Sequence, residues 1–276
     1  MKSVWNCLLE NVGEWRGSFT SLNLQGEILS EQPTVVTLSA SADRQQAKIV
    51  VDYQQQPDRR VEIPFTSVSR AYLGFDDGAF SQGGMQLAPF GEFGAEQGLL
   101  ADQQRRRLVW QYRDRQLQGL TLIREALPGI DAFQQAPLTV QDLLGTWSGI
   151  AETRYPDWRS PDRVTTQLRL EKVGDQLQSQ LDWGDRTIES LAQIQGSQLV
   201  FVGKQQAVTI WLLPGGVSCA CPTELALRSP FQLELGWLVS RDRRLRLIRS
   251  FDASGAWTSV TLITEQRLSD SSQVRV

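Results

Sequence analysis

The chain has 276 residues, of which 41% are hydrophobic and 21% are charged, as in soluble globular proteins and unlike disordered ones. Its formal net charge of −3 gives no overall attraction to nucleic acid or to an anionic membrane surface. The chain contains no histidine, which excludes Ser-His and Cys-His nucleophile pairs and every His-ligated metal centre.

The N-terminal residues do not form the apolar core of a secretory signal, and no apolar run approaches the roughly 18 residues needed to span a bilayer. Three cysteines, Cys7, Cys219 and Cys221, fit a reducing compartment better than a disulfide framework. We therefore expect a cytoplasmic protein with no membrane span and no nucleic-acid partner.

The first half of the chain opens with a short helical pattern at residues 4–11, followed by Gly13-Glu14-Trp15-Arg16-Gly17. Ala47–Tyr53 alternates in the period of two that predicts a β-strand. Glycine and proline then mark a boundary at residues 128–137.

The second half starts in the same way. A helical pattern at residues 138–144 precedes Gly145-Thr146-Trp147-Ser148-Gly149. Strand patterns follow at Gln176–Trp183 and at residues 256–264.

Four segments of the first half recur in the second half in the same order. The offset between them rises from 132 at Gly13 and Gly145 to 140 at Thr121 and Thr261, as loop insertions would cause. We predict an all-β fold of two tandem antiparallel β-barrels, each with a short N-terminal helix, at residues 1–128 and 138–268, with a flexible tail at 269–276. A long β-sandwich is the structural alternative.

Residues 78–90, together with Cys221-Pro222-Thr223-Glu224 and residues 231–237, resemble an uncharacterised calycin-superfamily family of oxygenic phototrophs. The resemblance covers nearly the whole chain and implies two lipocalin-like barrels. More distantly, the chain is similar to calycin-type bilin lyases, which load open-chain tetrapyrroles onto phycobiliproteins. No catalytic residue of those lyases can be placed on this sequence.

In lipocalin-like barrels, the tryptophan of the Gly-x-Trp motif closes the barrel floor beneath an arginine. We expect Trp15 and Trp147 to have this structural role, with Arg107 and Arg246 as the repeat-matched arginines stacked on them.

Two segments have the composition of loops that cover a ligand. The first is apolar and glycine-rich, and the second interleaves arginines with aromatic residues, which suits an amphipathic anionic ligand. Core packing or an interface is the alternative for both. The ligand-binding candidates are Phe80, Met85, Phe90, Phe93, Arg154, Tyr155, Trp158 and Arg159.

No catalytic or metal site is expected. Cys219 and Cys221 cannot supply the four ligands of a structural zinc site, so packing is the preferred interpretation of both. Arginine clusters at residues 105–107 and 241–249 indicate either solvated charge or a surface that meets an acidic protein partner or the propionates of a tetrapyrrole.

Three classes of function remain open. The first is a non-enzymatic binding protein for a lipophilic or tetrapyrrole-like ligand, with a bilin as one candidate cofactor. The second is a protein-interaction or assembly factor whose barrels are filled by their own side chains. The third is a bilin lyase or isomerase in which Glu92, Glu96 or Glu234 moves protons.

Overall fold

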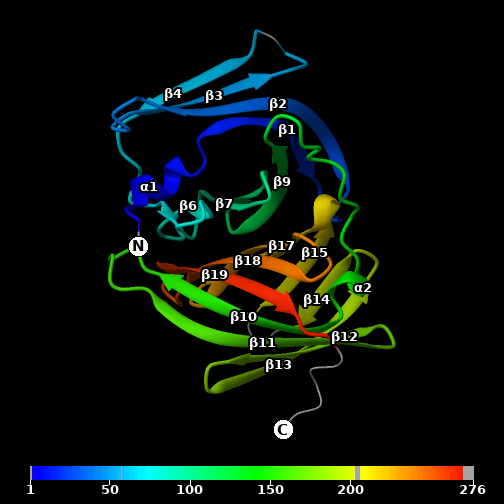
Figure 1. Ribbon diagram of the computed structural model, residues 1–276. Helices are drawn as coiled ribbons and strands as arrows, with labels where there is room; N and C mark the ends of the chain where they lie inside the picture. Colours follow the sequence, from blue (N-terminus) through cyan, green and yellow to red (C-terminus); the bar gives the residue numbers. More distant parts are fainter. Residues whose placement is uncertain (1, 57, 203–205, 270–276) are drawn as a thin grey trace. The chain divides into compact units, whose positions relative to one another are not determined.

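The computed structural model describes residues 2–56, 58–202 and 206–269. The chain divides into an N-terminal unit, residues 1–136, and a C-terminal unit, residues 137–276. Both units are built from antiparallel strands with one short helix in front (Figure 1). No helix in the described part of the chain has the length and apolar character needed to cross a membrane.

The described part of the N-terminal unit forms one curled antiparallel sheet of nine strands, in the order β4-β3-β2-β1-β9-β8-β7-β6-β5. The end strands β4 and β5 do not pair with each other, so the sheet is a half-barrel. Its elements are α1 (Val4–Leu9), β1 (Gly13–Leu22), β2 (Ile28–Ala40), β3 (Ala47–Tyr53), β4 (Arg60–Phe65), β5 (Leu73–Gly74), β6 (Phe80–Gly83), β7 (Glu92–Ala101), β8 (Gln104–Arg113) and β9 (Gln116–Ala126).

In the C-terminal unit, the strands β10 to β19 form a closed barrel in chain order, with β19 paired to β10. The elements are α2 (Val140–Leu143), β10 (Gly145–Arg154), β11 (Asp162–Val173), β12 (Gln176–Trp183), β13 (Arg186–Gln195), β14 (Gln198–Val202), β15 (Ala207–Leu213), a 3₁₀ turn (Pro214–Gly216), β16 (Val217–Cys221), β17 (Phe231–Leu238), β18 (Arg243–Phe251) and β19 (Trp257–Arg267).

The two Gly-x-Trp tryptophans occupy matching positions in their sheets. Trp15 lies opposite Val36 of the second strand, and Trp147 lies opposite Leu168. Both rings are buried, and each indole N–H donates to a carbonyl four residues earlier, of Asn11 or Leu143, at 2.8 and 2.9 Å. The first strand of each unit is thus attached to the turn that ends its short helix.

The all-β fold and the tandem repeat of antiparallel barrels, each with a short N-terminal helix, are confirmed. The structure differs from the expectation in one respect: only the C-terminal sheet closes. Residues 270–276 of the predicted tail lie outside the described residues.

Candidate functional site

The concave face of the N-terminal half-barrel encloses a cavity of about 600 Å³. Its walls are mainly apolar and include Phe19, Leu38, Ile49, Phe65, Phe80 and Ile123. Alternate residues of β3, β4 and β9 point to this face, because successive side chains of a strand point to opposite sides of a sheet. A cavity of this volume is in the range of small-ligand pockets.

Four charged side chains form an ion cluster at one side of this cavity. Glu125 accepts hydrogen bonds from Arg105 Nε at 2.7 Å and from Arg107 Nη2 at 3.0 Å. Arg107 Nη1 also donates to Glu96 at 2.6 Å. Glu125 is fully buried. The cluster holds two positive and two negative charges, so it is neutral as a whole.

Burial opposes ionisation of Glu125, but the charges of Arg105 and Arg107 and their hydrogen bonds outweigh it, and the pKa of this carboxyl lies below its ordinary value. Burial also disfavours the charged form of Arg107, yet Glu125 and Glu96 raise its pKa. Glu125 and Arg107 therefore stay ionised at neutral pH, and neither of them is prepared to exchange a proton.

Two polar atoms next to the cavity have no hydrogen-bond partner among the described residues. They are the hydroxyl of Tyr72 and Nη2 of Arg105, and both are buried. Burial raises the pKa of the Tyr72 hydroxyl, so this group stays protonated. Since buried polar groups normally have a partner, these atoms indicate where a water molecule or a polar group of a ligand would bind.

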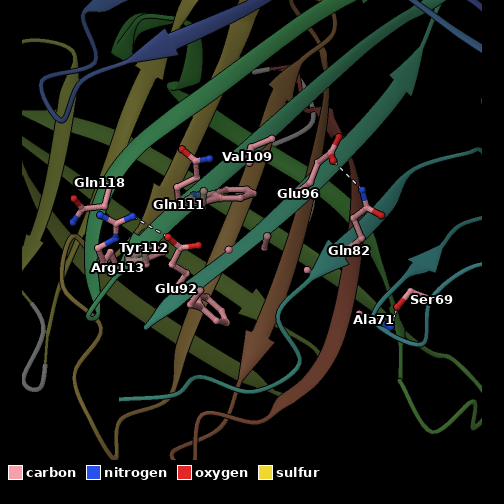
Figure 2. Close-up of a pocket in the computed structure, with 15 residues that line it drawn as sticks. Ser69, Ala71, Gln82, Glu92, Glu96, Val109, Gln111, Tyr112, Arg113 and Gln118 are labelled. Carbon is pink, nitrogen blue, oxygen red and sulfur yellow. Dashed lines mark hydrogen bonds and ion pairs between the residues drawn. The ribbon is translucent and has the colours of Figure 1, made fainter. Parts of the chain in front are cut away.

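A second hollow, of about 680 Å³, continues from the cavity along β7 and β8 (Figure 2). It shares Gln82, Glu96 and Gln111 with the lining of the cavity. Gln82 donates to Glu96 at 2.9 Å. This hollow is more polar than the cavity, so the concave face changes from an apolar to a hydrophilic lining along its length.

The C-terminal barrel contains a matching ion cluster. Arg246 pairs with Glu234 at 2.7 Å and with Glu265 at 3.3 Å, and Arg244 lies 3.7 Å from Glu265. The strand registers are equivalent, because Glu125 lies opposite Arg105 and Glu265 lies opposite Arg244. Such a duplicated arrangement indicates a structural role in both units. Glu96 and Glu234, considered above for proton transfer, are both held in these ion pairs.

The arginines stacked on the Gly-x-Trp rings are not the expected ones. Arg105 lies 4.5 Å from the Trp15 ring centroid, and Arg267 lies 4.1 Å from that of Trp147. Arg107 and Arg246 instead face the buried glutamates, which bind both sides of each guanidinium. The repeat gave no indication of Arg267. Its counterpart in the first half is Leu127, the residue directly after β9, which carries no charge.

The glycine-rich segment of the first half contributes only in part to the site. Phe80 lines the cavity and stacks on Tyr72, with 5.6 Å between ring centroids. Phe93 is buried and lines the second hollow. Met85 and Phe90 are 45% and 85% exposed and line neither space.

The arginine-rich segment of the second half lies outside both spaces. Arg154 is buried and pairs with Glu152 at 2.7 Å, while Tyr155 donates to Asp162. Arg159 stacks on Tyr155, and Trp158 is 64% exposed. These contacts lie within the segment and the strands that it joins, so the segment makes a compact loop of the C-terminal unit.

The arginine clusters are largely internal. Arg105, Arg106, Arg244 and Arg249 are buried, and they do not form the exposed surface that an acidic partner would meet. Cys219 and Cys221 are also buried, on one face of β16. Within the described residues, no three metal-binding side chains come together.

Sequence reasoning missed Tyr72, Arg105 and Glu125. Glu125 carried a signal, since it ends the Thr-Leu-Ile-x-Glu segment that recurs with Glu265. Tyr72 carried none, because its position follows from how residues 66–72 cross between β4 and β5.

These features define an all-β protein of two tandem barrel-type units, with an apolar cavity beside a neutral ion cluster in the N-terminal unit. A crystal structure of a protein of unknown function from the DUF3598 family of Nostoc punctiforme is 38% identical to this chain, with a TM-score of 0.92, and the match covers 97% of this chain and all of that one. Residues 1–130 match the family described as domain of unknown function DUF3598, N-terminal. The chain belongs to the DUF3598 family.

Residues 134–268 match a second family, described as biogenesis factor required for ATP synthase 1, C-terminal domain. The S-type phycobiliprotein lyase CPES from Guillardia theta is a remote structural neighbour, with 10% identity, a TM-score of 0.40, and coverage of 48% of this chain and 91% of the lyase. No match was found among curated proteins.

Proposed function

We propose that this protein is a non-catalytic assembly factor that binds a subunit of ATP synthase while the enzyme is being built. The observation that carries the proposal is the match of residues 134–268, the whole closed barrel, to the C-terminal domain of a biogenesis factor required for ATP synthase. We place this role in the cytoplasm, the compartment that the cysteine content favours.

Two measurements test the proposal. In cells that lack the gene, we expect less assembled ATP synthase on native gels, at unchanged synthesis of its subunits. In vitro, the purified full chain should bind at least one ATP synthase subunit when the subunits are offered one at a time. A normal amount of complex in the deletion strain, together with no binding to any subunit, would overturn the proposal.

A second candidate function is binding of an amphipathic anionic ligand, such as a bilin or a fatty acid. The observation that favours it is the cavity beside Arg107, with apolar walls and the unpartnered Tyr72 hydroxyl. Titration with biliverdin or oleate, followed by tryptophan quenching, tests it. Phe80→Ala should weaken binding at least tenfold, and Phe90→Ala, on the exposed part of the same segment, should not change it. Equal affinity in both variants would exclude the cavity as the ligand site.

A further inference from the structure

Two buried donors of the N-terminal cavity, on Tyr72 and Arg105, lie beside the helix α1. The Tyr72 hydroxyl adjoins Gly74, where an added Cβ would stand 3.3 Å from the hydroxyl oxygen and 2.8 Å from the Cβ of Cys7 in α1. Arg105 Nη1 donates to the side chain of Asn11, just after α1, at 3.3 Å. Because Tyr72, Arg105 and Asn11 all line the cavity, both donors belong to the same end of it.

Both donors are held in fixed positions. The ring of Tyr72 stacks on Phe80, with 5.6 Å between the ring centroids. Arg105 Nε donates to Glu125 at 2.7 Å, and its guanidinium lies 4.5 Å from the ring centroid of Trp15. The Tyr72 hydroxyl and Arg105 Nη2 have no hydrogen-bond partner among the described residues. A group that accepts from both donors therefore binds without having to order either side chain.

The fold does not require a hydroxyl at the position of Tyr72. Strand register matches Leu73 with Trp211 of the C-terminal barrel, because β5, β6 and β7 pair with the same spacing as β15, β16 and β17. Tyr72, one residue earlier, thus corresponds to Ile210, which packs against the core of the closed barrel. Since an apolar side chain serves at this position in one unit, the hydroxyl in the other unit indicates a role in binding.

The charges around the two donors are already balanced. Besides Arg105, the charged lining residues in the described part of the chain are Arg107 and Glu96. Arg107 pairs with Glu96 and with the buried Glu125, and Arg105 pairs with Glu125 as well. The cluster has no excess positive charge, and burial, which lowers the pKa of Arg105, adds none. An anionic group placed here would be buried without a counter-charge, which is unfavourable.

An uncharged carbonyl group meets both conditions. Its oxygen accepts two hydrogen bonds through two lone pairs, and it brings no proton that needs an acceptor of its own. An ammonium group cannot accept a hydrogen bond and would face the guanidinium of Arg105. The chemistry of the donors therefore selects a neutral acceptor over either kind of ion.

We propose that the cavity takes an apolar compound that ends in an uncharged carbonyl group, such as a ketone, a quinone or an ester. The carbonyl oxygen accepts from the Tyr72 hydroxyl and from Arg105 Nη2, and the apolar body packs on the walls formed by Phe65, Phe80 and Ile123. Any carboxylate of an amphipathic ligand stays in the more polar second hollow. This inference rests on the second candidate function, ligand binding in the cavity, and names the group that lies deepest.

The test compares three probes of nearly equal shape on the full chain. The first, para-butylacetophenone, carries the carbonyl group. In the second, para-butyl-α-methylstyrene, a CH₂ group replaces the carbonyl oxygen, and in the third, para-butylbenzoate, a charged oxygen replaces the methyl group. Tryptophan quenching measures binding of the ketone, and displacement of the ketone measures the other two. We expect one ketone to bind per chain with a Kd below about 100 µM.

The variant Tyr72→Phe removes only the hydroxyl. It should weaken ketone binding about three- to tenfold, the contribution of one hydrogen bond, and should leave the affinity for the other two probes within about twofold of the parent chain. Tyr53→Phe is the matched control. Tyr53 packs on Phe19 in the same unit and lines neither the cavity nor the second hollow, so this variant should bind all three probes as the parent chain does.

Two further measurements separate a lost hydrogen bond from a change in packing. The carbonyl stretching band of the bound, isotope-labelled ketone should lie at a lower frequency than in hexane. In Tyr72→Phe it should move only part of the way back, because the hydrogen bond from Arg105 remains. Without ligand, Tyr72→Phe should unfold at a temperature no lower than the parent chain, since the hydroxyl that it removes is buried without a partner.

Several results would overturn the carbonyl site. These are no ketone binding at about 1 mM, an unchanged ketone affinity or carbonyl band in Tyr72→Phe, and a lower unfolding temperature of that variant without ligand. An equal loss of affinity for the ketone and the benzoate would show that the donors take an anion instead.

These failures are distinct from failure of the functions proposed above. If Phe80→Ala weakens binding of biliverdin or oleate while Tyr72→Phe leaves the ketone unchanged, the cavity is a ligand site without this end group. If the ketone binds as described but biliverdin and oleate do not, the carbonyl site stands and the anionic ligand class falls. The assembly role is decided separately, by binding of ATP synthase subunits.

Discussion

At the scale of single residues, the ion cluster around Glu125 is the feature with the largest energetic consequence. Its partners Arg105 and Arg107 are almost fully shielded from solvent, at 5% and 13% side-chain exposure. Removing one member of a buried ion cluster leaves charge that nothing compensates, and this costs more than the intact cluster contributes. The cluster is therefore a strict requirement of the N-terminal fold.

We expect Glu125→Gln to destabilise the N-terminal unit by about 3–5 kcal/mol, because two buried guanidinium groups lose their common carboxylate. The control Glu92→Gln removes an ion pair with Arg113 that is exposed on both sides, and it should have no measurable effect. Urea unfolding, read for each unit, measures both. A loss below about 1 kcal/mol in Glu125→Gln would contradict the structural role of the cluster.

The same cluster predicts a dependence of stability on pH. The pKa of Glu125 is lowered from 4.5 in the folded state, and so is that of Glu234 in the other barrel. A lowered folded pKa stabilises the native state above the unfolded pKa, near 4.5, and this contribution is lost as the pH falls through the folded value. Urea midpoints measured from about pH 7 to pH 3 should fall steeply only below about pH 4.5, and less steeply in Glu125→Gln. If the curves of urea midpoint against pH run parallel in the parent chain and in Glu125→Gln, Glu125 does not contribute to the pH dependence of stability.

Residue identity alone could not have located this site. The period-two patterns assigned side chains to strand faces. The stacking of Arg105 on Trp15 and the pairing of Arg107 with the glutamates depend instead on contacts with strands far away in the sequence. The unexpected exposure of Phe90 has a similar cause. It lies in the loop before β7, where an apolar segment and an exposed loop tip have the same composition.

At the scale of elements, the pairing of β6 with β7 leaves no room for a side chain at Gly98. Phe80 lies opposite Gly98, and a Cβ added at Gly98 would stand 2.3 Å from Phe80 Cε1. The matching glycine of the other barrel, Gly236, would meet the Oγ of Ser218 at the same distance. A serine hydroxyl can rotate away, but a phenylalanine ring held against Tyr72 cannot.

We therefore expect Gly98→Ala to cost about 1–3 kcal/mol of stability, and Gly236→Ala less than half as much. Thermal unfolding of the two single variants provides the comparison. Because the displaced ring of Phe80 lines the cavity, Gly98→Ala should also weaken binding of biliverdin or oleate in the tryptophan-quenching titration. Equal losses of stability in the two variants would mean that the Phe80 ring moves as freely as the hydroxyl does.

The order of the elements was predictable where the two repeats agree. The paired Gly-x-Trp motifs and the alternation in Ala47–Tyr53 and Gln176–Trp183 were enough to define tandem β-barrels. The open edge was not predictable, because Gln198–Val202 looked like any other short strand in sequence. The strand registers show that its neighbours β13 and β15 have counterparts in the N-terminal unit, namely β4 and β5. They also show that β14 itself has none.

At the scale of the whole molecule, one barrel is complete and the other is open. This difference can be reversed by design. Inserting a second copy of residues 196–206 between Val68 and Ser69 gives the N-terminal unit the strand that it lacks, in the position that β14 has in the other unit.

We expect this insertion to close the N-terminal barrel and to fill its cavity. Apolar burial by the new leucine and phenylalanine should stabilise the unit by about 2–4 kcal/mol before the entropy cost of ordering 11 residues, so a clear gain in stability is not required. Strand register matches Phe65 with Ala192, so Thr66 and Val68 match Gln193 and Gln195, which pair with β14, and the decisive readout is amide protection at Thr66 and Val68. A control insertion, with serine in place of that leucine and phenylalanine, should leave these amides exchanging as in the parent chain. Lack of protection in the first insertion would show that the gap is not shaped for a strand.

Strand register matches Phe65 with Ala192 and Leu73 with Trp211, so the C-terminal unit has 11 more residues than the N-terminal unit between these points. A single in-frame insertion or deletion of 11 codons therefore accounts for the difference between a closed and an open barrel. Because the chain holds one closed copy, the other copy can vary in its opening while the chain retains a folded neighbour. Such variation can be confined to residues 66–72, with the tryptophans and ion clusters of both units left unchanged.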